Sequence, residues 1–280
     1  MRKRYLIVSD THYCHETEYN QLRYGNITND EKAARIIAQI EKEYKREKYE
    51  MIFFLGDYSL DHWWWDTKGS YLTRGVSYTE IFVKKYLQNL PAPYIMIPGN
   101  HEQFGEEMWK KITGMGRTNH AVDGDFLFIF WDSYGADLDP TEHSDGTYTP
   151  IDIPFVRGLM DQYPDKKVIL LSHYFVPNGT KEESELIADD RVVCMFQGHT
   201  HEPRIDTLPD AYKNKKLIHA GGWSHLYPGV KEPWGMRDIV IEDGVLTSHF
   251  FTEDYTYENG GQEYHIEERI YAGIEIPFEK

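Results

Sequence analysis

The sequence predicts an α/β fold that ends in antiparallel strands, which is an α+β feature. Short apolar runs of strand length alternate with amphipathic helical segments through the first two-thirds of the chain. The last third changes to strand-like segments joined by a tight turn. A chain of 280 residues is long enough to form one large domain with a sizeable core.

The predicted strands are continuous apolar runs, each ending at a glycine or a polar residue. Their length and their β-branched and aromatic content favour strands over buried helical segments. Because the apolar residues do not alternate with polar ones, we expect both faces of these strands to be covered. The runs occupy residues 51–55, 94–97, 126–131, 168–171 and 192–196.

Three segments between these strands carry helical patterns of apolar residues. Two of them begin with a capping box, in which Ser or Thr is followed three residues later by Glu. The segments are 28–44, capped by Thr28; 77–90, capped by Ser77 and stopped by Pro91; and 155–163.

The C-terminal third predicts a β-hairpin and a separate extension. Asp243-Gly244 is typical of a type I′ turn and lies between strand-like residues 238–242 and 245–251. With a strand at Leu217 and Ile218, these antiparallel pieces are expected to complete a second sheet. We predict one domain over residues 1–252 and an acidic, tyrosine-rich extension over 253–280, packed on the domain or on a partner subunit.

Composition narrows the classes of partner. The chain has 30 Lys and Arg against 46 Asp and Glu, a net charge of −16, which disfavours a nucleic-acid groove. The first apolar run, 5–8, is too short for a signal peptide, and no run approaches membrane-spanning length. Cys14 and Cys194 are far apart in sequence, so we expect no disulfide and a cytoplasmic protein. Whether the chain forms a homo-oligomer stays open.

Five short motifs rich in histidine and carboxylate residues follow apolar runs in order along the chain. Their side chains provide enough oxygen and nitrogen ligands for two adjacent metal ions. The glycines before several of them allow tight or unusual backbone at a strand end. The motifs are Asp10-Thr11-His12, Gly56-Asp57, Gly99-Asn100-His101-Glu102, Ser172-His173 and Gly198-His199-Thr200-His201.

The residue types suit a binuclear site. Asp57 is the natural bridge, because one carboxylate has two oxygens. One ion would be completed by Asp10, His12 and His201, and the other by Asn100, His173 and His199. A hydroxide between two such ions can attack a phosphate ester in line, while the ions neutralise the phosphoryl oxygens. Manganese, iron and zinc all suit mixed nitrogen and oxygen ligands.

This ordered set resembles the calcineurin-like metallophosphoesterases, whose pattern is D-x-H, GD, GNH-E/D, H and GH-x-H. The resemblance extends from Asp10 to His201 and implies a four-layer sandwich of two mixed sheets flanked by helices. It also implies the same metal ligands, with the ligand loops at the strand ends. In that family the histidine of GNH acts beside the phosphate, so His101 joins Asp57 as a catalytic candidate, and Glu102 has a supporting role.

The GH-x-H ending resembles the phosphodiesterase-type branch of the family. The protein phosphatase branch carries GD-x-x-D-R-G, whereas here Asp61 is shifted by one position and Arg-Gly is missing, which disfavours protein phosphatase activity. We therefore predict an enzyme acting on a phosphodiester or phosphomonoester of a small molecule. The alternatives are a nuclease and a non-catalytic scaffold. Scaffold members of the family typically lose ligand histidines, which this chain retains.

Other polar and aromatic features have simpler interpretations. We favour packing or a subunit contact for Trp63-Trp64-Trp65, over stacking on a substrate base. Residues 134–154 form either a cap over the site or a solvated acidic loop. His219 and His225 flank a Gly-Gly pair on a loop that could reach the site, although surface or core roles are simpler.

Overall fold

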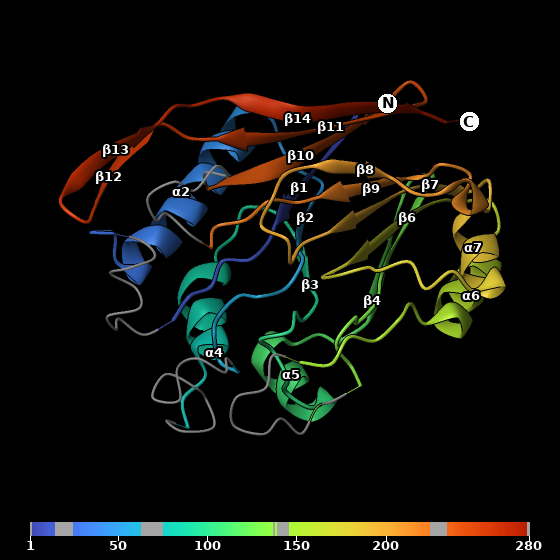
Figure 1. Cartoon of the computed structure of the whole chain (residues 1–280), viewed down its shortest axis with the longest axis horizontal. Helices are drawn as coiled ribbons and strands as arrows, with labels where there is room; N and C mark the ends of the chain where they lie inside the picture. The colour runs from blue at the N-terminus through green and yellow to red at the C-terminus, as the bar shows by residue number, and fades with distance from the viewer. Residues whose placement is uncertain are drawn as a thin grey trace.

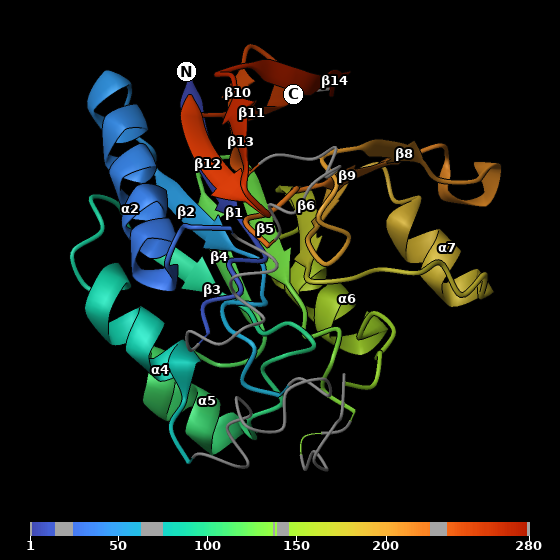
Figure 2. The same cartoon turned by 60° about the vertical axis from the view of Figure 1, so that its left-hand side comes forward.

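The computed structural model describes residues 2–14, 25–62, 75–136, 138, 146–224 and 234–278. Two six-stranded sheets lie face to face at its centre, and helices cover the outer face of each (Figures 1 and 2). Both sheets contain parallel and antiparallel strand pairs. The predicted four-layer α/β sandwich is confirmed.

The first sheet has the strand order β14-β11-β10-β1-β2-β3. Its N-terminal strands β1, β2 and β3 are parallel, whereas β10, β11 and β14 add antiparallel pairs beside β1. The bounds are β1 (Lys3–Val8), β2 (Met51–Phe54), β3 (Tyr94–Met96), β10 (Gly235–Glu242), β11 (Val245–Thr252) and β14 (Ile270–Pro277).

The second sheet has the strand order β4-β5-β6-β7-β9-β8. Four parallel strands form its centre, and an antiparallel strand lies at each edge. The bounds are β4 (Asn119–Asp123), β5 (Phe126–Phe130), β6 (Lys167–Ser172), β7 (Val192–Gln197), β8 (Ile205–Thr207) and β9 (Lys216–His219).

Helices α2, α4 and α5 pack on the first sheet, and α6 and α7 on the second (Figure 2). The bounds are α2 (Asn29–Arg46), α4 (Tyr78–Phe82), α5 (Glu106–Thr113), α6 (Ile153–Gln162) and α7 (Lys181–Ile187), with short turns η1 (Val83–Leu87) and η2 (Asp210–Tyr212).

The predicted helix starts are confirmed, but one predicted helix is interrupted. Thr28 forms the full capping box with Glu31. Ser77 caps α4 by accepting a hydrogen bond from the Glu80 N–H. The single helix expected over 77–90 changes to the π-helical turn η1, a wider turn in which Val83 and Leu87 are both buried.

The apolar core has three layers because the central strands bury both faces. In β1, Leu6 and Val8 pack toward the helices, whereas Tyr5 and Ile7 pack between the sheets. A third layer lies between the second sheet and helices α6 and α7. This arrangement explains why the predicted strands are continuously apolar rather than alternating.

Two C-terminal strands, β10 and β11, lie in a different sheet from the one predicted. The turn at Asp243-Gly244 has positive φ at both residues, 51° and 83°, as a type I′ turn requires. However, β10 and β11 join the first sheet, so the expectation that they complete the second was wrong. The predicted strand at Leu217 and Ile218 is part of β9 and does lie in the second sheet, where β8 pairs with it. After them, β12 (Tyr255–Asn259) and β13 (Gln262–Ile266) form a hairpin, and β14 pairs with β11. The domain boundary at residue 252 stays a prediction.

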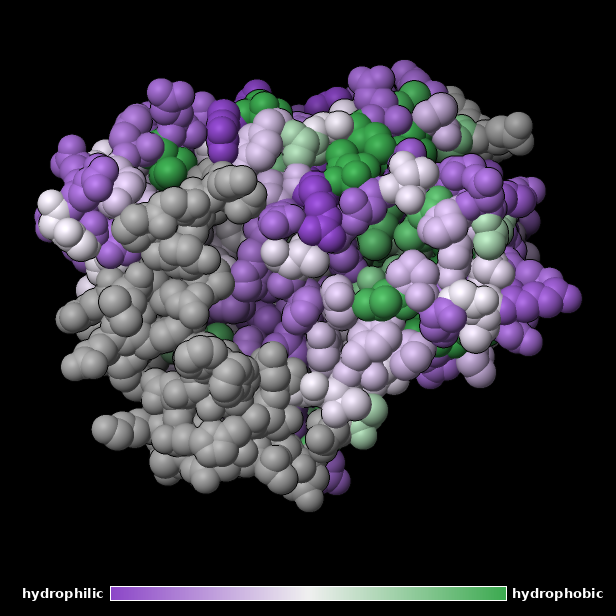
Figure 3. Space-filling model, viewed as in Figure 1, coloured by the Kyte–Doolittle hydropathy of each residue, from purple (hydrophilic) through white to green (hydrophobic). Residues whose placement is uncertain are grey.

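The surface of the described residues is mostly hydrophilic, and Figure 3 shows apolar residues in limited areas of one face. Large apolar side chains with high exposure are few among them: Val76, Val122, Val176 and Ile270. None of the described helices has the length and apolar character needed to cross a membrane. The predicted Trp63-Trp64-Trp65 run and His225 lie outside the described residues.

Candidate metal centre

The ligand-bearing loops leave the carboxyl ends of β1, β2, β3, β6 and β7 and meet at one edge of the two sheets. Backbone hydrogen bonds join the first two loops: the N–H of Asp10 donates to Gly56 O, and the N–H of His12 donates to Asp57 O, each at 3.0 Å. The His199 N–H donates to Asp10 Oδ2 at 3.1 Å, which links the last loop to the first. Parallel strands align their ends in this way, so the convergence follows from the topology.

Asp57 lies at the centre of the cluster. Its Oδ2 atom is 3.2 Å from His173 Nε2, 3.5 Å from His12 Nε2 and 3.7 Å from His101 Nε2. Its other oxygen accepts a hydrogen bond from the His101 backbone N–H at 3.1 Å. Burial opposes ionisation, but His173 and His101 hold the pKa of the Asp57 carboxyl well below its usual range.

Two donor groups flank Asp57. On one side, Asp10 Oδ1 is 3.3 Å from His201 Nε2 and 4.0 Å from His12 Nε2. On the other side, Asn100 Oδ1 is 3.0 Å from His173 Nε2 and 3.0 Å from His199 Nδ1. The structure thus brings together every residue that the sequence predicted as a metal ligand, in the two predicted sets.

The donor set fits two metal ions. Asp10 Oδ1 is fully buried and accepts no hydrogen bond from the described residues, although it faces two imidazoles. Three groups of side chains each bring ligand atoms within 4.8 Å of one another: Asp10-His12-His201, His12-Asp57-His101 and Asp57-His173-His199. Buried carboxylates surrounded by imidazole nitrogens are the donors that first-row transition metals and zinc prefer.

Several of these residues have backbone conformations that favour glycine. The φ angles are positive at Asp10 (54°), His12 (43°), Asp57 (54°), His199 (64°) and His201 (60°). Such conformations cost free energy for non-glycine residues and persist where the surrounding structure imposes them. At these strand ends the positive φ turns each side chain away from the strand direction and into the cluster.

Close packing explains the glycine that precedes Asn100. A Cβ atom at Gly99 would lie 2.1 Å from Asp57 Oδ1 and 2.6 Å from Asp57 N. Gly56 combines a close approach to Gly99 with a positive φ of 89°. The two loops therefore approach within backbone contact, which brings Asp57 and Asn100 together.

Glu102 joins the same two loops. Its Oε2 atom accepts hydrogen bonds from the backbone N–H groups of Asp57 at 2.8 Å and Gly99 at 2.9 Å, and Oε1 accepts one from Ser59 at 3.2 Å. Burial and the nearby Asp57 charge act to raise the pKa of Glu102, whereas the N–H groups of Gly99 and Ser59 favour its ionised form. These contacts fit the predicted supporting role.

The ring states of three histidines follow from their surroundings. Burial lowers the pKa of His12 to about 3 and that of His199 to about 4, so both rings are neutral near pH 7. Burial also acts on His173, but the Asp57 carboxylate raises the pKa of that ring to about 9. Because His173 Nδ1 lies 2.6 Å from Leu55 O, which can only accept, Nε2 is the atom directed at Asp57 and Asn100.

His101 is oriented by a neighbour that the sequence did not identify. Its Nδ1 atom lies 3.2 Å from His62 O, and His62 Nδ1 lies 3.1 Å from His101 O. Asp61, the acidic residue that is shifted by one position from the protein phosphatase pattern, accepts hydrogen bonds from Ser77 Oγ and from the N–H groups of Tyr78 and Thr79 at the start of α4. These contacts give Asp61 a capping role.

Arg117 is a second feature that the sequence did not reveal. This buried guanidinium donates to Asp132 Oδ2 at 2.6 Å and to the carbonyls of Glu102 and Phe104 at 2.9 and 2.7 Å. It also reaches Tyr134 O at 3.3 Å. Arg117 therefore ties the loop after β3 to the loop after β5.

Aromatic rings border the centre on the side of His199. The Tyr174 ring centroid is 4.3 Å from that of His199, and the Tyr134 centroid is 5.9 Å from it. Residues 146–154 of the segment expected to be a cap or a solvated loop are described, and Gly146 lies against Tyr134 and Asn100. Four acidic residues of that segment, Asp137, Asp139, Glu142 and Asp145, lie outside the described residues.

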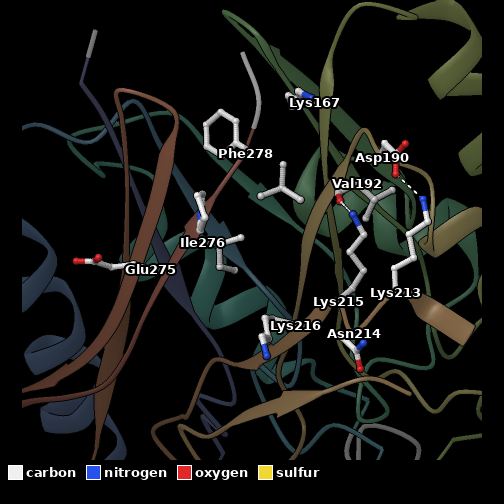
Figure 4. Close-up of a pocket in the computed structure, with 12 residues that line it drawn as sticks. Lys167, Asp190, Val192, Lys213, Asn214, Lys215, Lys216, Glu275, Ile276 and Phe278 are labelled. Carbon is white, nitrogen blue, oxygen red and sulfur yellow. Dashed lines mark hydrogen bonds and ion pairs between the residues drawn. The ribbon is translucent and has the colours of Figure 1, made fainter. Parts of the chain in front are cut away.

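A large cavity lies away from the histidine cluster. It has a volume of about 590 Å³ and is lined by Lys167, Val192 and Lys216, the first residues of β6, β7 and β9 (Figure 4). The candidate ligands follow the other ends of β6 and β7. The cavity and the histidine cluster are therefore at opposite ends of these strands.

Solved structures of known proteins are similar to this chain. The solved structure of a dimetal phosphatase from Danio rerio matches with a TM-score of 0.67 and 12% identity, covering 99% of each chain. A Vps29 variant from Entamoeba histolytica has a TM-score of 0.41 and 14% identity, covering 96% of this chain and 99% of that one. The NAD nucleotidase of Haemophilus influenzae has a TM-score of 0.48 and 13% identity, covering 96% of this chain and 49% of that one. No curated protein matches the chain.

The first of these likenesses shows a shared fold and no more, because its sequence identity is low. The family comparison is more direct. The family model described as calcineurin-like phosphoesterase matches residues 3–203, a range that includes all five motifs. The chain belongs to the calcineurin-like phosphoesterase family.

Proposed function

We propose that this protein is a binuclear metal-dependent phosphoesterase that hydrolyses a phosphodiester or phosphomonoester of a small molecule. The observation that carries the proposal is the position of Asp57 between two donor sets, Asp10-His12-His201 and Asn100-His173-His199. Two cations held there would lower the pKa of a water molecule between them and withdraw negative charge from a phosphoryl group.

The protein's own groups would supply the remaining chemistry. Asp57 would neutralise and space the two cations, and the amide oxygen of Asn100 would complete one ligand set without adding charge. His101 Nδ1 donates to a carbonyl, so its Nε2 edge is the one available to a substrate. In its protonated form His101 would donate a hydrogen bond or a proton to the departing oxygen.

The same proposal includes the finer points of metal, substrate and location. Mixed nitrogen and oxygen donors suit manganese, iron or zinc. The net charge of −16 favours a small phosphate ester over a long nucleic acid. Neither Cys14 nor Cys194 forms a disulfide, which agrees with a cytoplasmic location.

Metal analysis combined with a substrate panel tests the proposal. Purified protein would be stripped with a chelator, reloaded with Mn²⁺, Zn²⁺ or Fe²⁺, and assayed on aryl phosphodiesters, aryl phosphomonoesters and nucleotides. We expect about two ions per chain and hydrolysis that disappears when the ions are removed. Full metal loading without hydrolysis of any ester would instead favour the scaffold alternative, and cleavage of DNA or RNA alone would favour a nuclease.

A further inference from the structure

A buried histidine outside the proposed ligand set contacts the loop between two of the ligands. His219, the last residue of β9, is only 1% exposed. Its Nδ1 atom lies 2.8 Å from Thr200 Oγ1, and its Nε2 atom lies 2.9 Å from Asp206 Oδ2 on β8. Strands β8 and β9 are paired, which holds Asp206 and His219 on one rigid element (Figure 2). Thr200 stands between His199 and His201 in sequence.

The direction of each hydrogen bond from Asp206 through His219 to Thr200 is fixed. The Asp206 carboxylate only accepts, so His219 Nε2 carries the hydrogen and Nδ1 must accept from the Thr200 hydroxyl. Gln197 Nε2 lies 3.1 Å from Nδ1 and 3.4 Å from Nε2 of His219, and because Nε2 of His219 carries the hydrogen, only Nδ1 can accept from it. Its amide is oriented because Gln197 Oε1 accepts from the Phe175 N–H at 2.7 Å. The imidazole therefore has one neutral tautomer in which both nitrogens are satisfied.

His219 is also firmly anchored. Its backbone N–H donates to Arg204 O at 2.9 Å, and its carbonyl accepts from Arg237 Nε at 2.9 Å. The loop that it contacts is strained, since His199 and His201 have positive φ on either side of Thr200. A rigid, buried imidazole thus holds the middle of a turn whose backbone is unfavourable without support.

We propose that Asp206, His219 and Thr200 form a positioning relay that holds the His199–His201 turn in its metal-binding geometry and so sets the affinity of the centre for metal. This inference rests on the proposed function, because it takes His199 and His201 as ligands. Groups that orient metal ligands typically contribute about 10- to 100-fold in metal affinity. Since Thr200 acts through the backbone between the ligands, we expect the lower end of that range.

Paired substitutions separate the relay from a general packing role. In His219→Gln the longer side chain places its amide near the Nε2 position, which keeps the Asp206 contact and loses the Thr200 contact. In His219→Asn the amide oxygen lies near the Nδ1 position and can still accept from Thr200. Thr200→Val removes the hydroxyl at constant shape, and Thr200→Ser keeps it. His249→Gln and Thr207→Val make the same chemical changes away from the loop.

The measurement is calorimetric titration of each chelator-stripped variant with Mn²⁺, with thermal unfolding of the same stripped protein. We expect His219→Gln and Thr200→Val to lose about 10-fold in Mn²⁺ affinity. His219→Asn, Thr200→Ser and the two control variants should stay within about 3-fold of the wild type. If His219→Gln does not fold, Thr200→Val decides the question, because Thr200 is only half-buried.

Three results are distinguishable. Wild-type Mn²⁺ affinity in both His219→Gln and Thr200→Val overturns the relay while leaving the proposed function intact. A wild-type protein that binds no metal overturns the proposed function and the relay with it. Loss of hydrolysis in Thr200→Val at unchanged Mn²⁺ affinity also overturns the relay, because a carboxylate, an imidazole and a hydroxyl in this order would then be activating Thr200 as a nucleophile.

Discussion

Glu102 accepts a hydrogen bond from the backbone N–H of Asp57 at 2.8 Å, which fixes the backbone position of the proposed bridging ligand. The same carboxylate accepts from Gly99 and Ser59, so three N–H groups on two loops depend on one side chain. Glu102 is fully buried, and water cannot take its place without opening the structure. Its contribution is therefore to the geometry of the loops rather than to the chemistry.

Glu102→Gln should reduce activity by about 10- to 100-fold, as is usual when a group that orients a metal ligand is altered. Glutamine has the same shape. However, its NH₂ group would replace a carboxylate oxygen that accepts a hydrogen bond from a backbone N–H, so two donors would face each other. Glu263→Gln makes the same change on the exposed strand β13 and should leave kcat/KM unchanged. Equal rates for the two variants would show that Glu102 has no supporting role.

His101→Ala should retain both metal ions but lose about 10²- to 10⁴-fold in kcat, the usual contribution of a positioned acid or base. The reason is that His101 Nε2 is 3.7 Å from Asp57 Oδ2 and faces the centre, whereas two complete ligand sets remain without it. The measurement is metal content by mass spectrometry together with hydrolysis of an aryl phosphodiester.

His265→Ala, which removes an exposed ring from β13, is the matched control for the His101 variant. It should behave as the wild type in both measurements. If His101→Ala lost metal in proportion to its activity, His101 would be a ligand and the assignment of a separate catalytic role would be wrong.

Removal of metal should lower the stability of the protein as well as its activity. Asp10 and Asp57 are buried carboxylates, and cations compensate their charge in the folded state only. Ligands that bind only the folded state stabilise it by about 2.7 kcal/mol at 100 times Kd. We expect the Tm of chelator-treated protein to rise with added Mn²⁺ until the centre is saturated.

Asp57→Asn should abolish most of that Mn²⁺-dependent rise in Tm and nearly all turnover. The substitution keeps the shape of the side chain but removes the charge that both donor sets share. Asp254→Asn, which changes an exposed carboxylate, should show the full rise. An undiminished Mn²⁺ response in Asp57→Asn would contradict the bridging role.

The sequence predicted the layers of the fold because its central strands are buried on both faces. Continuous apolar runs such as Phe126–Phe130 can only lie between two covering layers, so both sheets were foreseeable. The edge strands of the second sheet were not: β4 and β8 are short and half-exposed and have no apolar run. The sheet that β10 joins was also mispredicted, because a hairpin specifies its own pairing and says nothing about which third strand it meets.

The candidate site was only partly predictable from the sequence: its candidate ligands were identified, but only some of the residues that position them were. The proposed ligands are carboxylate, amide or imidazole side chains in short motifs that follow apolar runs, so Asp10, Asp57 and His199 could be identified from local sequence. Arg117 and His219 act through carbonyl and hydroxyl groups contributed by distant loops. The partners of Arg117 depend on how the two sheets pack, which local sequence does not indicate. The sequence placed His219 on a loop that could reach the site, but its contact with Thr200 follows from the pairing of β9 with β7.

Gly99→Ala tests the close approach of the two central loops. A Cβ atom there would lie 2.1 Å from Asp57 Oδ1, so either the carboxylate or the loop must move. We expect a loss of about 1–3 kcal/mol in stability, as for other overpacked sites, and a loss of metal at the same time. Gly158→Ala adds the same atom on α6, where a Cβ would meet nothing within 4 Å, and should be neutral or stabilising. Urea unfolding of both variants with and without Mn²⁺ makes the comparison. If Gly99→Ala kept wild-type stability and metal content, Asp57 would have room to move and its tightly packed position would not be required for binding.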